Sequence, residues 1–420
     1  MKIKTNKRLR VLGICLMAFM TGMVAAATPS AAARRHIIIR HHAHHAAEVT
    51  HPSEPFIEGA VIINADTGEV VSPARNAEEV FNPASNTKVA TTLAILRKFG
   101  AEHRFTVGIR TNGTVSNGEL KGDLYVTGSY LLFDDSDARQ LKQILRRKGI
   151  DSISGDLYVS PDFSMNLSIT GLAAGQRLET ILKPVHEVIK HRVRRKVVVT
   201  TNDVPGVAIH GQTKLASSAP AGATLVTEYN SPPLKHVLKR MLSPSDNEMA
   251  ERFGEMIGGP AALTQFIINE LGIPAAQVQF ASTSGLYVNR LSPDAMVKIL
   301  VALRNQLARE HLTFADVMAV AGVDAGTLIH RFTGDHERAS VIAKTGTLPE
   351  TDHGASALSG EVHTKMGTYL FAIFDMHGDV SKFRSRQNEE IMSFQKSHGG
   401  AQPITYHPVL PNFQSESFWH

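Results

Sequence analysis

A serine and a lysine at the start of an apolar stretch constrain this chain most. The segment NPASNTK, residues 82–88, runs directly into the apolar segment VATTLAIL, residues 89–96. A helix here would place Ser85 and Lys88 on one face, about one turn apart. Ser85 would also lie at the positive end of the helix dipole, which favours a developing negative charge, and Pro83 fits the position before the first turn.

This pair predicts a nucleophile beside its base. Burial of a lysine amine disfavours its charged form, so a buried Lys88 could accept the proton of the Ser85 hydroxyl. The pattern is loose, because a helix cap followed by a solvated lysine has the same spacing. A second copy occurs at Ser393 and Lys396. The pair therefore needs support from the rest of the chain.

The first 27 residues are typical of a secretory signal peptide. Five basic side chains precede an apolar run and the small residues VAAA at positions 24–27. We therefore expect export to the periplasm or cell envelope, with cleavage near residue 27. These five charges account for the net charge of +5, and the remaining chain balances 39 basic against 39 acidic residues. The charge thus predicts no nucleic-acid partner. The single cysteine, Cys15, lies in this segment, which excludes disulfides and cysteine-ligated zinc from the mature chain.

The rest of the chain divides by composition into a tether, a two-part domain, an insertion and a tail. Residues 28–55 are rich in Ala and His and predict a tether, with a histidine metal site as the alternative. Residues 56–103 and 225–396 predict one domain of helices and strands. Residues 104–224 carry short alternating runs broken by Gly, Asn and Asp, which predict an inserted, mainly β domain. Residues 397–420 are a polar C-terminal extension.

Hydrophobic periodicity places the elements of the two-part domain. Two strands are expected around a glycine-containing turn near Gly68, and the Ser85 helix should end at Phe99, before Gly100. Further helices are expected at residues 234–242, 248–257, 259–271 and 295–307, and strands at residues 339–348, 355–363 and 368–376.

The predicted insertion contains a short repeat. The phrase GDLYV occurs at residues 122–126 and again at residues 155–159, which suggests two similar hairpins. Helices are expected at residues 136–147 and within residues 178–193. The basic run at residues 191–196 is interpreted as a solvated strand edge, with a site for an anionic polymer as the alternative.

Two further motifs supply polar groups that suit the Ser85 pair. In an extended loop, Ser245 and Asn247 would point the same way, so both could face one cleft. The sequence Lys344-Thr345-Gly346-Thr347 would alternate along a strand and present a cation and hydroxyls to a substrate carboxylate. Gly346 would leave a flat edge for an added peptide strand.

These motifs differ in how specific they are. The spacing Ser-x-Asn is loose, and Ser164-Met165-Asn166 competes with it, but Ser245 precedes a helix directly. Lys-Thr-Gly is rarer and occurs once in the chain. Three motifs in this order therefore favour a catalytic Ser85.

In these motifs the chain resembles the serine DD-peptidases of the penicillin-binding protein and serine β-lactamase superfamily. More narrowly, it resembles the low-molecular-mass class C penicillin-binding proteins, the D-alanyl-D-alanine carboxypeptidase/endopeptidase family. The 160 residues between Ser85 and Ser245 fit the long insertion of that family. The resemblance covers about residues 56–396, and further matching phrases are SPPL at 231–234, SGL at 284–286, NRLSP at 289–293 and GTL at 326–328 with Arg331.

The resemblance implies an α+β, transpeptidase-like (β-lactamase-like) domain, with an antiparallel sheet flanked by helices and a mainly β insertion domain. It also implies a Ser85 acyl-enzyme on peptidoglycan stem peptides or cross-links, and penicillins as covalent inhibitors. Lys88 would be the base, Ser245 a proton relay, and the backbone N–H groups of Ser85 and Thr347 an oxyanion hole. Substrate binding would involve Asn247, Lys344, Thr345, Gly346 and Thr347. No metal or cofactor is implied.

The chain departs from the family pattern at two places. Residues 282–285 read STSG instead of Asp-Gly-Ser-Gly, and residues 128–130 read GSY where Gly-Asp-Pro is usual. A non-catalytic peptidoglycan-binding protein is therefore one alternative. A class A β-lactamase is another, although no Glu-x-x-x-Asn segment that could supply its deacylating glutamate follows Ser245. Carboxypeptidase or endopeptidase preference and oligomeric state stay open.

Overall fold

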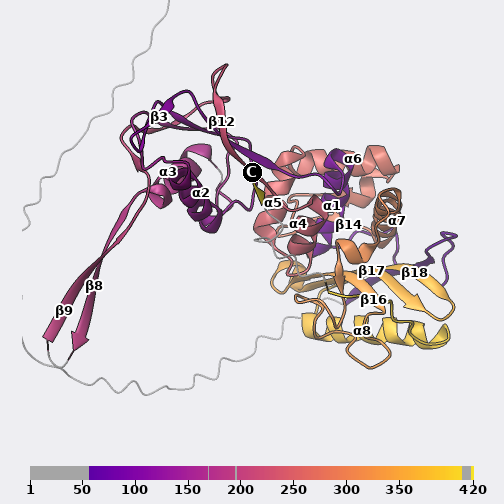
Figure 1. Cartoon of the computed structure of the whole chain (residues 1–420). Coiled ribbons are helices and arrows are strands. Elements are labelled where there is room, and N and C mark those ends of the chain that lie inside the picture. Colours follow the sequence, from indigo (N-terminus) through magenta and orange to yellow (C-terminus); the bar gives the residue numbers. More distant parts are fainter. Residues whose placement is uncertain (1–55, 169, 194–195, 409–417) are drawn as a thin grey trace, which may run out of the picture. The chain divides into compact units, whose positions relative to one another are not determined.

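The computed structural model describes residues 56–168, 170–193, 196–408 and 418–420 (Figure 1). The expected signal peptide and histidine-rich tether lie outside these residues. Within the described ranges, no helix combines the length and the apolar character needed to cross a membrane.

An antiparallel sheet forms the centre of the two-part region. In the described chain it has five strands in the order β1-β18-β17-β16-β15. Their bounds are β1 Ile57–Asn64, β15 Ala319–Val320, β16 Val341–Leu348, β17 Ala355–Thr364 and β18 Gly367–Met376. The three expected C-terminal strands are thereby confirmed. The strand expected after Gly68 contributes only an isolated bridge between Ile63 and Val70.

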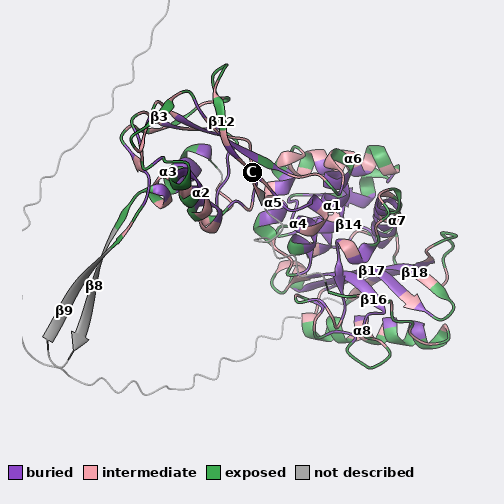
Figure 2. Ribbon diagram, in the orientation of Figure 1, coloured by how far each residue is buried: buried purple, intermediate pink, exposed green. Residues whose placement is uncertain are grey.

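Both faces of this sheet carry a buried core. Successive side chains of a strand point to opposite sides, so each strand contributes to both cores. Val61 and Ile63 join the core on the side of α7, Pro293–Arg309, whereas Ala60 and Ile62 join a second core on the side of α8, Val380–Ser397. Figure 2 shows the resulting buried strands between partly exposed helices.

The remaining helices of this region lie close to their expected positions: α1 Thr87–Phe99, α4 Leu234–Leu242, α5 Asn247–Met256 and α6 Gly259–Leu271. Helix α1 is buried along its first ten residues, and it ends where Gly100 adopts a φ of 81°. Ser292 caps α7 by accepting from the Ala295 N–H, with proline in the first turn.

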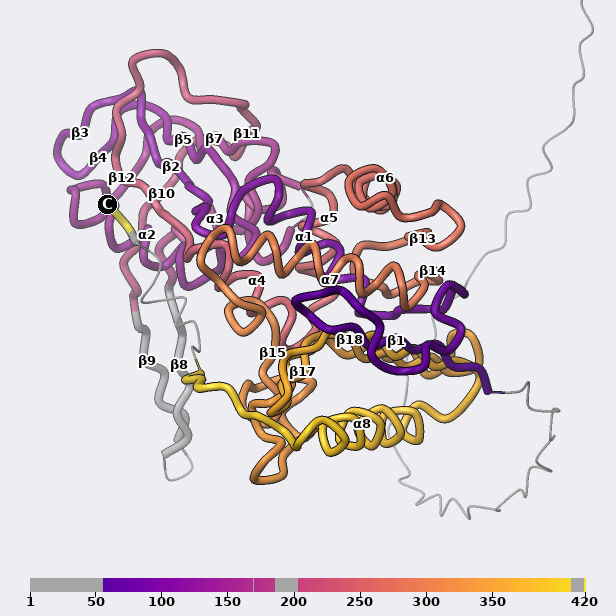
Figure 3. Tube along the Cα trace, turned by 90° about the vertical axis from the view of Figure 1, so that its right-hand side faces the viewer, coloured from indigo at the N-terminus to yellow at the C-terminus, as the bar shows by residue number. Residues whose placement is uncertain are grey.

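Helix α8 was not predicted. Its sequence is largely polar, and Phe383, Ile391 and Phe394 are its buried apolar side chains. Asp379 starts it by accepting from the Ser381 and Lys382 N–H groups. The helix packs against β17 and runs along the sheet (Figure 3).

The described strands between α1 and α4 belong to other sheets. One has the order β11-β7-β5-β2-β12-β19, one the order β10-β6-β4-β3, and β8 pairs with β9. The bounds are β2 Thr106–Thr111, β3 Thr114–Ser116, β4 Glu119–Lys121, β5 Leu124–Thr127, α2 Asp135–Arg147, β6 Ser152–Ile153, β7 Leu157–Val159, α3 Gly171–Leu182, β8 Val185–Val193, β9 Lys196–Val204, β10 Ala208–Ile209, β11 Thr213–Leu215, β12 Thr224–Asn230 and β19 Phe418–Trp419. Strand β19, in the expected C-terminal extension, pairs with β12.

Two expectations for this part were wrong. The GDLYV repeat does not form two hairpins: β5 and β7 are parallel neighbours, with Tyr125 opposite Tyr158 and their rings 4.9 Å apart. Helix α2 lies between them in the chain, as a parallel connection requires. The helix expected within residues 178–193 ends at Leu182, because Pro184 and a β-branched run then favour strand β8. The structure does not describe the side chains of the basic run at residues 191–196, so the interpretation of that run stays a prediction.

Candidate active site

Ser85 lies in a short 3-10 turn, η1 Ala84–Asn86, that leads directly into α1. The Lys88 amine is 2.9 Å from Ser85 Oγ, so the two side chains meet as their spacing predicted. Lys88 Nζ also donates to Asn247 Oδ1 at 2.6 Å and to the Ser284 carbonyl oxygen at 2.7 Å.

The surroundings of Lys88 suit a base. Its side chain is 0% exposed, and burial lowers its pKa to about 7, against the opposing charges of Glu251 and Asp246. The oxygens of Asn247 and Ser284 can only accept, so they take both N–H groups of a neutral amine. The nitrogen lone pair is then left for the Ser85 hydroxyl.

Two buried asparagines hold the turn that carries Ser85. Asn82 Oδ1 accepts from the Ala84 N–H at 3.0 Å, where Ala84 has a φ of 45°, and Asn82 Nδ2 donates to Asp352 at 2.8 Å. Asn86 Oδ1 accepts from the Ser359 hydroxyl on β17. The strained turn is thus fixed to its surroundings on either side of the nucleophile.

Ser245 lies in a tight turn between α4 and α5, and Asn247 is the first residue of α5, so the extended loop that was expected is not formed. Ser245 has a φ of 66°, and Asp246 caps α5 by accepting from the Met249 N–H. Both side chains nevertheless contact a lysine: Asn247 contacts Lys88, and Ser245 Oγ accepts from Lys344 Nζ at 2.8 Å.

Lys344 is the second buried lysine of the site, with 1% of its surface exposed. Its amine also donates to the Thr345 carbonyl oxygen at 2.8 Å. Burial and the nearby charge of Lys88 lower the pKa of Lys344 well below its ordinary value. On the same strand, Thr345 Oγ1 donates to Thr327 Oγ1 at 2.8 Å.

Two glycines allow close packing around Ser85. A Cβ on Gly346 would lie 2.5 Å from the Pro83 carbonyl oxygen, and one on Gly285 would lie 1.8 Å from that of Ala84. Gly285 also has a φ of +81°. The sequence predicted glycine at position 346 because it leaves room for a peptide strand. The structure adds a second reason, because a side chain there would collide with the Pro83 carbonyl.

The altered segment 282–285 still contributes to the site. The Glu251 carboxylate accepts from the Thr283 hydroxyl at 2.9 Å and from the Ser284 N–H at 3.0 Å. Burial opposes ionisation of Glu251, but these hydrogen bonds lower its pKa overall. They fix the Ser284 carbonyl that accepts from Lys88. Glu251 was not singled out from the sequence.

A cavity of about 450 Å³ opens beside Ser85. Four of the expected residues line it: Ser85, Ser245, Thr345 and Thr347. Lys88 and Lys344 contact the lining residues Ser85 and Ser245, and Asn247 contacts Lys88. The other lining residues are Thr327, His330, Arg331, Arg384, Ser385 and Asn388, and the last three come from the unpredicted helix α8.

The competing motifs lie elsewhere. Ser164 Oγ donates to the Ser168 carbonyl, and Asn166 Nδ2 donates to Asp135, which are local structural contacts. Ser393 and Lys396 are exposed on α8. Neither motif has the buried lysine and hydroxyl pair of the Ser85 site.

The comparisons with known proteins point to one family. The model of the D-Ala-D-Ala carboxypeptidase 3 (S13) family matches residues 45–166 and 195–396. Carboxypeptidase DacB of Mycolicibacterium smegmatis is 26% identical over 366 residues, which is 77% of each chain.

Two solved structures share the fold. One is the penicillin G-acylated predatory endopeptidase Bd3459 of Bdellovibrio bacteriovorus with immunity protein Bd3460, at 22% identity and a TM-score of 0.67 over 87% of this chain and 100% of that chain. The other is penicillin binding protein 4 (dacB) of Haemophilus influenzae, complexed with a β-lactam. It has 20% identity and a TM-score of 0.60 over 82% of this chain and 97% of that chain. The expected α+β, penicillin-binding-protein-like fold is confirmed. By its family model, the chain belongs to the D-Ala-D-Ala carboxypeptidase 3 (S13) family and is a serine-type peptidase.

Proposed function

We propose that Ser85 is the nucleophile through which this peptidase cleaves D-alanyl bonds in peptidoglycan stem peptides or cross-links. The observation that carries this role is the 2.9 Å contact between Ser85 Oγ and the amine of Lys88, whose pKa is lowered to about 7. At neutral pH, about half of such amines are free to accept a proton. Ser85 would then attack the carbonyl of the penultimate D-alanine.

The charge that develops on the carbonyl oxygen needs donors fixed in advance. We assign them to the backbone N–H groups of Ser85 and Thr347, an arrangement that is typically worth several kcal/mol. The close approach of Gly346 to the Ser85 turn supports this assignment, because it brings the two backbones together.

Departure of the amine requires a proton. Ser245 Oγ accepts a hydrogen bond from Lys344, so its own proton is free to pass to the leaving nitrogen, and Lys344 can replace it. The C–N bond breaks as this proton arrives, and Ser85 remains acylated. Water then attacks the ester, Lys88 returns its proton to the Ser85 oxygen as the ester bond breaks, and the proton lost by water restores the one that Lys344 gave up.

The other expected residues would bind substrate. Asn247 would orient the substrate amide, while Lys344, Thr345 and Thr347 would face its terminal carboxylate, with Gly346 between them. Penicillins would acylate Ser85 as substrate mimics. The acylation of the structural neighbour Bd3459 by penicillin G supports this expectation.

We also propose that the chain is exported to the periplasm or cell envelope after cleavage near residue 27. The match to a family of D-Ala-D-Ala carboxypeptidases supports export, since their substrate lies outside the cytoplasm. A domain inserted at residues 104–224 is supported by strands β2 to β11, which share no described sheet with β16 to β18.

Labelling with a fluorescent penicillin tests the nucleophile. Ser85→Ala should abolish labelling, whereas Ser393→Ala, in the exposed second copy of the motif, should leave it unchanged. Labelling that survives in Ser85→Ala would refute the assignment. Incubation with a D-Ala-D-Ala muropeptide and a cross-linked dimer, followed by mass spectrometry, would show which bond is cleaved. No product from either would favour a binding protein.

A further inference from the structure

The carboxylate of Asp352 has no role in the reaction proposed above, yet it contacts two segments that build the active site. Asp352 belongs to the 3-10 turn η4 Thr351–His353, which connects β16 to β17. Its Oδ2 accepts from Asn82 Nδ2 at 2.8 Å. The guanidinium of Arg290 donates to Oδ1 at 2.9 Å and to Oδ2 at 3.1 Å, which makes a bidentate ion pair.

Asn82 connects this carboxylate to the nucleophile. The Asn82 side chain is fully buried, and its Oδ1 accepts from the Ala84 N–H at 3.0 Å, one residue before Ser85. Ala84 has a φ of 45°, a strained conformation that persists only where the surroundings hold it. Because a carboxylate can only accept, Asp352 fixes the Asn82 amide with its nitrogen toward Asp352 and its oxygen toward Ala84. Loss of this acceptor would leave the amide free to turn.

Arg290 connects the same carboxylate to the segment that supplies the Ser284 carbonyl. Its Nη1 also donates to the Asn289 carbonyl oxygen at 3.0 Å. The buried Asn289 side chain accepts from the Ser282 N–H at 3.1 Å and donates to Thr87 Oγ1 at 2.8 Å. This segment is therefore closed against the first turn of α1, and Arg290 holds its end.

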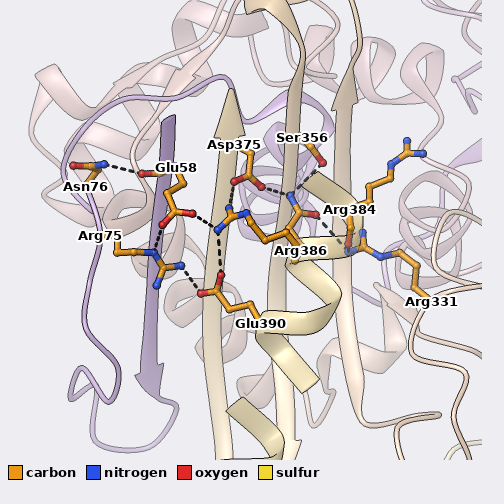
Figure 4. Close-up of polar contacts among 10 residues, drawn as sticks. Glu58, Arg75, Asn76, Arg331, Ser356, Asp375, Arg384, Arg386 and Glu390 are labelled. Carbon is orange, nitrogen blue, oxygen red and sulfur yellow. Dashed lines mark hydrogen bonds and ion pairs between the residues drawn. The ribbon is translucent and has the colours of Figure 1, made fainter. Parts of the chain in front are cut away.

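Another acid of the sheet, Asp375 on β18, belongs to a separate set of contacts (Figure 4). Asp375 pairs with Arg386 and accepts from Gln387 Nε2 at 2.8 Å, and Gln387 Oε1 accepts from Arg331 Nη2 at 3.4 Å. We call this set the α8 network, because it ties α8 to the sheet; it also includes Glu58, Arg75 and Glu390. None of these contacts involves the turn that carries the nucleophile, so the α8 network does not substitute for Asp352.

Asp352 carries a negative charge at neutral pH. Its side chain is only 16% exposed, and burial opposes ionisation. The hydrogen bonds from Arg290 and Asn82 nevertheless lower its pKa overall. Both hydrogen bonds are therefore charge-assisted, which makes them stronger than neutral ones.

We propose that Asp352 is a positioning residue for the acylation of Ser85, because it holds Asn82 and Arg290 and, through them, the segments that support the nucleophile and its base. The proposal rests on the proposed function, since Asp352 itself performs no chemical step. The Ser85 N–H follows the Ala84 peptide, so a turn that loosens at Ala84 displaces both the hydroxyl and one donor of the proposed oxyanion hole. Such a defect slows the chemical step and leaves binding before the reaction nearly unchanged.

The test measures the reaction with a penicillin at increasing concentration, which separates the maximum acylation rate from the half-saturating concentration. Asp352→Ala should lower the maximum rate by about 10- to 100-fold, the usual range for a lost hydrogen bond to a charged group. The half-saturating concentration should change by less than about threefold. Asp352→Asn retains an acceptor for Asn82 and should recover part of the rate. Asp66→Asn breaks an exposed pair with Arg304 and is the matched control, which should leave both quantities unchanged.

Arg290→Gln tests the second contact of the carboxylate. It should lower the maximum rate by about tenfold, and combining it with Asp352→Ala should add little, because the two side chains act as one unit. The pH midpoint of acylation should stay unchanged in these variants, since the charges that raise the pKa of Lys88 are those of Glu251 and Asp246. A shifted midpoint would mean that Asp352 acts on Lys88 through its charge, and it would overturn the positioning role.

Urea unfolding of the same variants separates positioning from stability. A variant that is less stable but keeps the wild-type maximum rate would show a purely structural contact and overturn the proposal, as would equal losses in rate and affinity. If Asp352→Ala does not fold, Asp352→Asn and Arg290→Gln decide by the same readouts. Failure of penicillin to acylate Ser85 in the wild-type protein would contradict the proposed function, and the positioning role with it.

Discussion

The two ends of the active-site cavity hold buried cations of different kinds. At the lysine end, Lys88 and Lys344 are 0% and 1% exposed, and burial lowers both pKa values. At the arginine end, Arg331 is 8% exposed, and its pKa falls only to about 10. Similar burial therefore gives an amine that can exchange its proton and a guanidinium that keeps its charge.

This difference separates a group that can transfer a proton from a group whose charge is fixed. Proton transfer requires a group whose pKa lies near the working pH, which the lysine end provides. The arginine end instead provides a charge that does not titrate in that range. If this comparison is correct, a substitution at one end should leave the signature of the other end unchanged.

The largest effect should come from exchanging the chemistry at the lysine end. Lys88→Arg keeps a cation near Ser85 but removes the base, so the acylation rate should fall about 1,000-fold, within the range for loss of general-base catalysis. The rate of labelling by a fluorescent penicillin measures this change. Lys98→Arg, at an exposed position in the last turn of the same helix, is the control and should leave the acylation rate unchanged. A fall of less than about tenfold would mean that another group takes the proton.

The lysine end was accessible from the sequence because its motifs are local. Ser85 and Lys88 are three residues apart at the start of one helix, so the helix itself brings them together. The long-range meeting of Lys88 with Asn247, and of Lys344 with Ser245, followed from the order of the motifs and the family resemblance. Their contact distances depend on packing that no spacing encodes.

The arginine end could not be found in the same way. Helix α8 is largely polar, so it lacks the apolar period that identifies a helix in a sequence. Arg331 appeared only as part of a matching phrase, and Arg384 carried no signal. The buried glycines show the same limit: the contact between Gly285 and the Ala84 carbonyl joins segments about 200 residues apart in the chain.

The pH dependence of acylation should show a large effect that belongs to the lysine end alone. Below the pKa of Lys88, the amine is protonated and cannot accept from Ser85, so the rate falls as the pH falls. With a pKa of about 7, the rate at pH 5 should be about 100-fold below its plateau, because one proton gives about tenfold per pH unit. Arg384→Gln should keep the same midpoint. A shifted midpoint in Arg384→Gln would show that the charge at the arginine end influences the pKa of Lys88.

Glu251→Gln should have a smaller effect on acylation, and it tests whether Glu251 sets the pKa of Lys88. The Glu251 charge raises the pKa of Lys88, so its removal should move the midpoint of the acylation profile to lower pH. Weaker support for the Ser284 carbonyl should also reduce the plateau rate by about tenfold, as expected for one charged hydrogen bond. Glu255→Gln, exposed on the same helix, is the control. A midpoint shifted to higher pH would contradict this account.

The smallest effect on acylation should come from Gln387→Leu, which breaks the link between the α8 network and Arg331. Asp375 and Ser356 then lose a buried donor, so the free energy of unfolding in urea should fall by about 1–3 kcal/mol. Gln143→Leu, an exposed position on α2, controls for the substitution itself. The acylation midpoint should stay near pH 7, since Gln387 contacts neither buried lysine; a shifted midpoint would show that the fixed charge and the titrating amine are coupled through the sheet.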